Sequence, residues 1–446
     1  MKKKHLNIKN FFNKKIFIDS REVKENSIFI CIKGEKKDGH SFAKKILKNF
    51  LNVIVVCEKK TKYLKNIKKY KNRIVLCDST ISYMQDFAKI KRLLLNNSLF
   101  IGITGSSGKT TLKETVFNCL SAFNKSYRSK KSFNNHIGLP FTLINQNQSS
   151  KFNIYELGMN KLGEINFLSK ILKPNIAVIT NIGEAHLGKL GSVKAIAKAK
   201  SEIIKNIEYK GLIILNRDCN FFNYFKKIAK EKKLNILTFG KNKNANIFYR
   251  INNKGNYDLF FRNKKIFSDL LILNINQINN IMICALLLFK LQLNLKKGIR
   301  KIQNFSSLKG RGNIVKKSKK ITLIDDSYNS NPISLKSSLD FLSEYKNNSK
   351  KIAVIGDMLE LGKFSKKKHE DIGKYINAIN IDKVYTIGKE SKKIFYQLDP
   401  SKRGSCYKNI KAFQKEFDKL IVANSVILFK ASNSIGLYKF LNNKIY

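Results

Sequence analysis

The sequence predicts an α/β protein of three domains: a small α/β domain, a central parallel-sheet domain and a C-terminal Rossmann-like domain. The chain has 446 residues, which is too long for one ordinary hydrophobic core and suggests about three domains. From about residue 98, short apolar runs alternate with longer segments of helical periodicity, as in parallel, doubly wound sheets. A glycine-rich stretch, GITGSSGKTT (102–111), joins the first such run to the first such helix.

The first domain is expected to span residues 1–95. Its short apolar runs are interrupted by polar and turn-forming residues, which indicates short strands and helices. The runs lie in KIFIDSREVKENSIFICIKGE (15–35), NVIVVCE (52–58) and NRIVLCD (72–78). Strands of this length favour a small α/β domain.

The central domain is expected to span residues 96–308. Its first strand is SLFIGITG (98–105), and a helix follows because Leu112, Val116 and Leu120 recur at helical spacing. Further strands are expected at FNIYELG (152–158), IAVITNIG (176–183) and GLIILN (211–216). Alternation of this kind is typical of a parallel sheet.

The last domain is expected to span residues 309–446, after a short linker at LKGRGN (308–313). Its strands are expected at ITLIDD (321–326), KIAVIGD (351–357), KVYTIG (383–388) and SVILFKAS (425–432). Helical segments separate these strands, so a second, Rossmann-like sheet is predicted.

The formal net charge of +56 invites a nucleic-acid interpretation. However, the lysines are spread over the whole chain instead of forming one stripe. Arginine, which recognises phosphates and bases better, is far less common than lysine. We therefore interpret the charge as a property of composition and expect no nucleic-acid partner.

No apolar run approaches the roughly 20 residues that a membrane-spanning helix needs. The N-terminal residues MKKKHLNIKNFFNKK are basic but lack the sustained apolar segment of a secretion signal. The seven cysteines are scattered and include no C-x-x-C pair, which favours buried reduced thiols over a metal site. We expect a cytoplasmic protein that does not insert into membranes.

The glycine-rich stretch predicts a phosphate-binding loop, because it follows a strand and opens a helix. Gly105 and Gly108 would let backbone N–H groups turn towards a phosphate, and the helix N-terminus would add positive charge. Lys109 would reach the outer phosphates, and the Thr110 hydroxyl would bind Mg²⁺. The other loop residues expected to bind ATP are Ser106, Ser107 and Thr111. The alternative is a turn without a ligand.

The loop departs from the common spacing G-x-x-x-x-G-K-[ST], because Ile103 stands where that spacing needs glycine. Its form, G-x-T-G-x-x-G-K-T-T, resembles that of the Mur ligases. The resemblance continues at DSREVKENSIFICIKGEKKDGHSF (19–42), NNHIGLPFTL (134–143), ELGMNKLGEI (156–165), TNIGEAHLGKLGSVKAIAKAKSEI (180–203), DDSYNSNPISLKSSLDFL (325–342) and GDMLELG (356–362). These segments are similar to the type that adds D-alanyl-D-alanine; the D-N-P-R signature of the type that adds the third amino acid is not found.

The resemblance implies a P-loop-type ATPase domain in the centre and an ATP-dependent ligase that uses Mg²⁺. ATP would phosphorylate the terminal carboxylate of UDP-N-acetylmuramoyl-tripeptide, and the amine of D-alanyl-D-alanine would then displace phosphate. The product, UDP-MurNAc-pentapeptide, serves peptidoglycan synthesis. We expect these two substrates as partners of a monomeric enzyme, with diaminopimelate and lysine both open as the third residue of the tripeptide.

The resemblance also implies catalytic or metal-binding roles for four residues, Lys109, Glu156, His186 and Lys200. Glu156 ends a strand, where a carboxylate can hold Mg²⁺ directly or through water. The resemblance implies that His186 is a metal ligand beside the reacting phosphate. It also matches Lys200 to a lysine that family members carbamylate, giving an anionic metal ligand; Lys198 is the alternative register. Carbamylation needs the neutral amine, and therefore a lowered pKa.

Further contacts are implied in the flanking domains. ATP contacts are implied for Asn280, Arg311, Asp325, Asp326, Tyr328 and Asn329. Ser20 and Arg21 of the DSR segment would lie near the UDP moiety. The plainer interpretation of these residues is a solvated linker cation, a helix cap or a polar turn.

Two segments depart from the family pattern. In NINQINN (274–280), Asn274, Asn276 and Gln277 replace the usual glycine, histidine and asparagine near the adenine, and in KASN (430–433) Asn433 replaces arginine. Three alternatives therefore stay open: another ligase of the superfamily, acting on a different UDP-muramoyl peptide or on folate; a P-loop protein that binds nucleic acid; and a relative without activity, kept as a scaffold.

Overall fold

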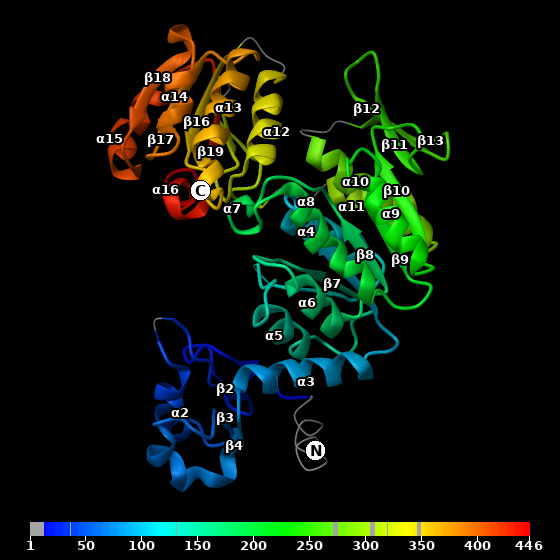
Figure 1. Cartoon of the computed structure of the whole chain (residues 1–446), viewed down its shortest axis with the longest axis vertical. Helices are drawn as coiled ribbons and strands as arrows, with labels where there is room; N and C mark the ends of the chain where they lie inside the picture. The colour runs from blue at the N-terminus through cyan, green and yellow to red at the C-terminus, as the bar shows by residue number, and fades with distance from the viewer. Residues whose placement is uncertain are drawn as a thin grey trace.

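The computed structural model describes residues 13–35, 37–130, 132–270, 275–303, 308–318, 320–345 and 349–446, with only the backbone at 275 and 276. Within these residues the strands form sheets of four, nine and six strands, each with its own helices. Figure 1 shows the three sheets along the long axis, with the first at one end. We call them the N-terminal, central and C-terminal units. No described helix has both the length and the apolar character needed to cross a membrane.

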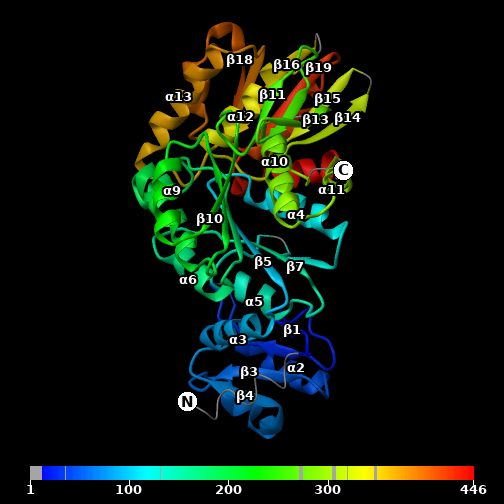
Figure 2. The ribbon, with the colours of Figure 1, turned by 90° about the vertical axis from the view of Figure 1, so that its right-hand side faces the viewer.

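The N-terminal unit is a parallel sheet in the order β1-β2-β3-β4. Its strands are β1 (Ile16–Phe17), β2 (Ile28–Ile30), β3 (Ile54–Glu58) and β4 (Ile74–Cys77). Its helices are η1 (Gly39–Phe42), α2 (Ala43–Asn49) and η2 (Leu64–Arg73). The helix α3 (Thr80–Leu94) leads from this sheet to the central unit, where it packs on α5 and α6 (Figures 1 and 2).

The central unit has the strand order β13-β12-β11-β10-β9-β8-β5-β7-β6. Its strands are β5 (Leu99–Thr104), β6 (Ser126–Arg128), β7 (Phe152–Glu156), β8 (Ile176–Ile179), β9 (Leu212–Asn216), β10 (Asn235–Gly240), β11 (Ile247–Ile251), β12 (Tyr257–Phe261) and β13 (Lys264–Leu270). All neighbouring strands between β11 and β6 in this sheet order, β5 included, pair in parallel, as predicted for this sheet. The strands β12 and β13 add an antiparallel edge.

Helices cover both faces of the central sheet. They are α4 (Lys109–Ser121), α5 (Gly138–Ile144), α6 (Glu164–Leu172), α7 (Leu187–Leu190), α8 (Val193–Ser201), η3 (Glu202–Asn206), α9 (Phe222–Glu231), α10 (Ile275–Lys290) and α11 (Leu295–Gln303). Buried residues of α4, α10 and α11 form one core with the sheet, and those of α5, α6, α8 and α9 belong to the core of the other face. Because helices cover both faces of the sheet, residues on both sides of each strand are buried, and the strand sequences are nearly continuous apolar runs.

The C-terminal unit has the strand order β14-β15-β19-β16-β17-β18, parallel except for β14. Its strands are β14 (Asn313–Ser318), β15 (Ile321–Asp325), β16 (Lys350–Gly356), β17 (Lys383–Ile387), β18 (Arg403–Tyr407) and β19 (Ser425–Lys430). Its helices are α12 (Pro332–Ser343), η4 (Gly362–Phe364), α13 (Ser365–Asn377), α14 (Lys392–Gln397), η5 (Pro400–Lys402), α15 (Ile410–Leu420), η6 (Asn433–Ile435) and α16 (Leu437–Lys444). The predicted α/β fold of three sheet domains is thus observed.

Candidate active site

A large cavity lies where the central and C-terminal units meet. Its volume is about 1210 Å³, and both units contribute to its wall. A typical ligand pocket measures a few hundred to about 1,000 Å³, so this cavity has room for more than one small molecule. The predicted site residues that line it are Ser106, Ser107, Gly108, Lys109, Thr110, Thr111, Glu156, His186, Asn280, Arg311, Asp326, Tyr328 and Asn329.

The phosphate loop, residues 105–111, joins the end of β5 to the first turn of α4. Gly105 has φ 152°, and a β-carbon built on it would lie 1.8 Å from Oγ1 of Thr180, so this position requires glycine. Gly108, with φ 78°, is the N-cap of α4. The N–H of Leu112 bonds to O of Gly108, which leaves the N–H groups of the three residues between them without a partner inside the helix. Such a helix N-terminus attracts phosphate.

The end of the neighbouring strand β8 fixes the loop in place. Asn181 accepts hydrogen bonds from N of Ser106 at 3.0 Å and from N of Ser107 at 2.8 Å. Oγ1 of Thr180 donates to O of Ser107 at 2.8 Å. The Ser106 hydroxyl donates to O of Gly183 at 3.1 Å and accepts from its N at 2.9 Å. The loop conformation therefore depends on residues 180–183 as well as on its own glycines.

Lys109 lies over its own loop. Its Nζ donates to O of Gly105 at 2.8 Å. Burial lowers the pKa of Lys109, and the charge of Arg311 lowers it further, whereas the carboxylates of Glu156 and Glu360 raise it. A phosphate bound in the loop would add negative charge beside this ammonium and favour its protonated form.

Glu156 stands at the end of β7 and is 2% exposed. Its Oε2 accepts from Oγ1 of Thr110 at 2.8 Å, and its Oε1 accepts from Nδ2 of Asn134 at 2.8 Å. A β-carbon on Gly158 would lie 2.8 Å from Cγ of Asn134, so this glycine makes room for the amide. Asn134, which the sequence interpretation did not single out, therefore orients the strand-end carboxylate that accepts from the loop hydroxyl.

Asn134 was missed because an asparagine pair before a helix looks like an ordinary cap. The available signal was its place in the NNHIGLPFTL segment, where both Asn134 and Asn135 come to line the cavity.

Lys200 lies on α8 and is 1% exposed, whereas Lys198 is exposed. Burial brings the pKa of Lys200 well below its usual value; the charge of Lys109 acts in the same direction, and that of Glu156 opposes it. Lys200 does not line the cavity, but it is close enough to Lys109 and Glu156 to be affected by their charges. Burial thus shifts the proton equilibrium of Lys200 towards the neutral amine.

His186 lies in the left-handed region, with φ 61°, just before α7. It reaches the cavity, and its Nδ1 lies 2.7 Å from Oε2 of Glu360 in the C-terminal unit. The hydrogen bond from His186 is the main reason why the pKa of Glu360 is lowered. Glu360 stands in the GDMLELG segment, but no role was predicted for it.

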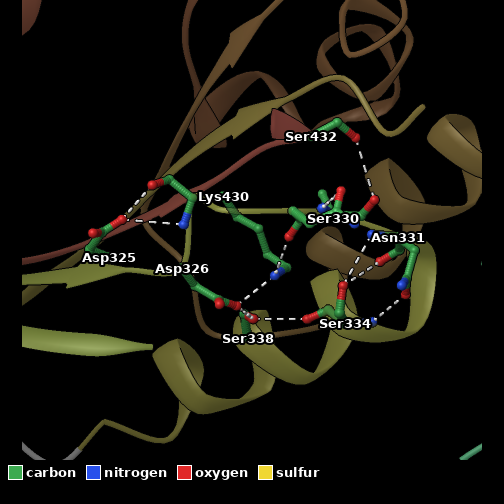
Figure 3. A network of polar contacts seen from close by, with 10 residues as sticks. Asp325, Asp326, Ser330, Asn331, Ser334, Ser338, Lys430 and Ser432 are labelled. Atoms are coloured by element: carbon green, nitrogen blue, oxygen red, sulfur yellow. Dashed lines mark hydrogen bonds and ion pairs between the residues drawn. The ribbon is translucent and has the colours of Figure 1, made fainter. Parts of the chain in front are cut away.

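The C-terminal wall carries an ion pair between a buried lysine and a partly exposed aspartate. Oδ2 of Asp326 lies 2.5 Å from Nζ of Lys430 and accepts from the Ser338 hydroxyl at 2.6 Å. Lys430 is 2% exposed and also donates to O of Asn329 at 3.2 Å. Figure 3 shows Lys430 reaching towards Asp326 and Ser338 from the neighbouring strand. Asp326 and Lys430 both face the cavity.

Asp325 points away from the cavity, unlike Asp326. It is fully buried and accepts hydrogen bonds from N of Gly310, the Ser327 hydroxyl and the Tyr446 hydroxyl. Its carboxylate thus ties the start of the unit to its last residue, and the geometry offers no contact to a ligand. Asn331, by contrast, caps α12 in a reciprocal capping box with Ser334.

Arg311 and Tyr328 lie together on the C-terminal wall. The guanidinium carbon of Arg311 is 4.1 Å from the Tyr328 ring centroid, a cation–π distance. Nδ2 of Asn433 donates to O of Tyr328 at 3.3 Å. Asn433, which stands where the resemblance implies an arginine, therefore supports the loop that carries Tyr328.

Ser20 and Arg21 lie in the N-terminal unit and outside the cavity. The side chain of Arg21 is 86% exposed and pairs with Asp19 at 2.5 Å. Near the N-terminal side of the cavity, Gln85 on α3 lines the wall and donates to O of His136 at 2.9 Å.

In the segment near the predicted adenine site, Asn274 lies outside the described residues, and only the backbone of Asn276 is described. Gln277 and Asn280 both line the cavity, and Asn280 is buried.

Comparison with protein families covers most of the chain. Residues 14–92 match the description "Mur ligase family, catalytic domain", residues 103–288 match "Mur ligase middle domain", and residues 310–433 match "Mur ligase, glutamate ligase domain".

Curated relatives and solved structures agree with these matches. The chain is 32% identical to UDP-N-acetylmuramoyl-tripeptide–D-alanyl-D-alanine ligase of Buchnera aphidicola subsp. Baizongia pistaciae, over 94% of this chain and 89% of that protein. It is 31% identical to the ligase of the same name from Rickettsia prowazekii, over 95% and 93%. The crystal structure of MurF ligase from Thermotoga maritima in complex with ADP is 26% identical, with a TM-score of 0.84 and 97% of each chain covered. MurF from Acinetobacter baumannii is 25% identical, with a TM-score of 0.84, over 96% of this chain and 93% of that one.

Proposed function

Because the chain belongs to the Mur ligase family, we propose that its cavity joins D-alanyl-D-alanine to UDP-N-acetylmuramoyl-tripeptide with the energy of ATP. The product is UDP-MurNAc-pentapeptide, a precursor of peptidoglycan. The observation that carries this proposal is the composition of the cavity wall. A phosphate loop and a buried carboxylate on one side of the cavity face an ion pair and an arginine on the other. Curated ligases that share this one function match nearly the full chain.

The reaction runs in two steps. A carboxylate oxygen of the tripeptide attacks the γ-phosphorus of ATP and ADP leaves, so that an acyl phosphate forms. The amine of the dipeptide then attacks the acyl carbon, phosphate leaves, and the nitrogen loses a proton as the amide forms. In the first step anionic oxygens approach one another, and the helix N-terminus and the Lys109 ammonium offset their repulsion.

Mg²⁺ fits the oxygen donors of the central wall. The Thr110 hydroxyl and the Glu156 carboxylate are hard ligands of the kind Mg²⁺ prefers, and they are hydrogen-bonded to each other. Mg²⁺ in proteins is usually held by one or two carboxylates together with phosphate oxygens and water, so bound ATP would supply further ligands to the ion. When bound, Mg²⁺ neutralises charge on the phosphates. Asn134 fixes the carboxylate for this purpose.

Lys200 and His186 complete the proposed metal site. The lowered pKa of Lys200 shifts it towards the neutral amine that CO₂ needs, and a carbamate on this side chain would be an anion able to bind the metal. His186 approaches the same cavity from the start of α7, held by Glu360 of the opposite unit.

The proposed domains are residues 1–95 for the UDP-sugar end of the substrate, 96–308 for ATP and 309–446 for closing the site. Ser20 and Arg21 would serve the UDP end, outside the ATP cavity. Asn280, Arg311, Asp326, Tyr328 and Asn329 would contact ATP, with Asp325 supporting their loop. A monomeric enzyme of the cytoplasm suits a nucleotide-linked precursor.

Phosphate release tests the proposal. Wild-type protein with ATP, Mg²⁺ and UDP-N-acetylmuramoyl-tripeptide is expected to release phosphate with D-alanyl-D-alanine, but not with single amino acids, and mass spectrometry should find the pentapeptide. Lys109→Ala is expected to lose at least about 100-fold in rate, on the scale of removing one transition-state charge contact. The matched control Lys125→Ala, an exposed lysine beyond α4, should keep the wild-type rate. Phosphate release without the muramoyl peptide, or no release with all substrates, would refute the assignment.

A further inference from the structure

Residues 180–188, which follow β8, touch two parts of the protein at once. Their first residues hold the phosphate loop, as described above for Asn181 and Gly183. Their later residues contact the C-terminal unit. Lys368 of α13 pairs with Glu184 at 2.6 Å, and N of Gly188 donates to O of Glu360 at 2.9 Å. This short segment is therefore a direct link between the docked C-terminal unit and the loop.

Gly183 is the point where the two sets of contacts coincide. On the loop side, its N and O both bond to the Ser106 hydroxyl. On the other side is Ile333, in the first turn of α12: a β-carbon built on Gly183 would lie 1.6 Å from its Cδ1, 2.8 Å from its Cγ1 and 3.5 Å from its Cβ. The δ-methyl of Ile333 thus fills the space that a side chain at 183 would occupy.

We propose that Ile333 is a positioning residue for the ligase reaction, whose δ-methyl, seated on Gly183, sets the phosphate loop through Ser106 when the C-terminal unit docks. This inference rests on the proposed function for its catalytic readout. Close-packed contacts transmit small displacements instead of absorbing them. A shift of about 1 Å in the reacting groups can cost about 100-fold in rate. Ile333 touches no substrate in this account and acts only through Gly183.

Enlarging the side chain at 183 and shortening the one at 333, singly and together, tests the proposal. The φ of Gly183 lies outside the left-handed region, so alanine is tolerated by the backbone itself. Gly183→Ala should lower kcat at least about tenfold, because its β-carbon and the Ile333 δ-methyl cannot both fit. Ile333→Ala should lower kcat several-fold by leaving a gap. The double variant places two β-carbons about 3.5 Å apart, an ordinary contact, and should return kcat to within about threefold of wild type.

Two readouts separate positioning from general damage. KM for the muramoyl peptide should stay unchanged in all three variants, because the N-terminal unit is untouched. Leu342→Ala, in the core of the same helix, should lower the melting temperature yet keep kcat at a temperature where it stays folded. Wild-type kcat in Gly183→Ala, or a double variant no faster than Gly183→Ala, would overturn the proposal.

A cross-link tests the contact without requiring ligase activity. In Gly183→Cys/Ile333→Cys, the two β-carbons would be about 3.5 Å apart, within the range of a disulfide. Copper-phenanthroline would accept the two electrons as two protons leave the thiols, and a gel shift with peptide mass analysis would report the bond. The wild-type chain and each single variant are the controls, since five native cysteines are buried. Rapid cross-linking is expected; its absence with and without ATP would overturn the proposal. If the cross-link forms in a protein without ligase turnover, the proposed function fails and the contact stands.

Discussion

A buried lysine between the N-terminal and central units makes stability depend on pH. Lys91 of α3 is almost fully buried, and its Nζ donates to O of Ile144 on α5. Burial lowers its pKa from 10.5 to about 8. We expect Lys91→Met to stabilise the protein at pH 7, because methionine fills similar space without a charge.

The size of this effect follows from the pKa shift. Each pKa unit is worth about 1.4 kcal/mol, so the shift costs the folded state on the order of 3 kcal/mol wherever Lys91 is charged in both states, below pH 8. Between pH 8 and 10.5 the unfolded chain binds the proton and the folded chain does not, so the free energy of unfolding rises with pH. Loss of the hydrogen bond to Ile144 offsets about 1 kcal/mol. A net gain of about 2 kcal/mol is expected at pH 7, and it should vanish near pH 10.

Urea unfolding followed by circular dichroism at pH 7 and pH 10 measures this difference. The control is Lys89→Met on the same helix; the Lys89 side chain is half exposed, and its ammonium pairs with Asp86 at 3.0 Å. Its effect should stay within about 0.5 kcal/mol at both pH values. If Lys91→Met destabilises the protein at pH 7, or its effect does not change with pH, the burial argument is wrong.

Three other predictions concern the site. Asn134→Ala should lower turnover about 10- to 100-fold and raise the Mg²⁺ concentration needed for half-maximal rate, since it removes the partner that orients Glu156; initial rates in a Mg²⁺ titration check this. Gly105→Ala should abolish binding of a fluorescent ATP analogue, because its β-carbon would lie 1.8 Å from Oγ1 of Thr180; retained affinity would contradict this. Arg21→Ala should raise KM for the UDP substrate and leave kcat unchanged, since its exposed side chain lies outside the cavity; steady-state kinetics decide, and a fall in kcat would count against it.

The fold and the phosphate loop could be predicted from the sequence because each is encoded by a short contiguous stretch of residues. A buried parallel strand is a short apolar run, and a phosphate loop is a contiguous pattern beside it. The strand β13 was not predicted because lysine, serine and aspartate interrupt its apolar positions, and β12 was not predicted because it is a run of only five residues that includes an aspartate.

Other site features depend on contacts that no local pattern encodes. Neighbouring aspartates look equivalent in sequence, yet Asp325 turns inward and Asp326 faces the cavity, because consecutive residues of an extended chain point in opposite directions. The pairing of Asp326 with Lys430 joins residues from two strands that are distant in sequence. The resemblance selected Lys200 over Lys198, and the structure adds that Lys200 is buried whereas Lys198 is exposed.

The order of strands in the central sheet also explains why the surface residues of the protein can change without moving the site. The strand β5 lies between β7 and β8, so Ile103 is paired with Glu156, and Thr104 with Ile179, in the registers of the two ladders. Backbone hydrogen bonds thus set the spacing between the loop, the carboxylate and the segment behind them. The exterior can therefore carry many lysines without displacing the phosphate loop or Glu156, because the backbone pairing of buried strands positions both of them.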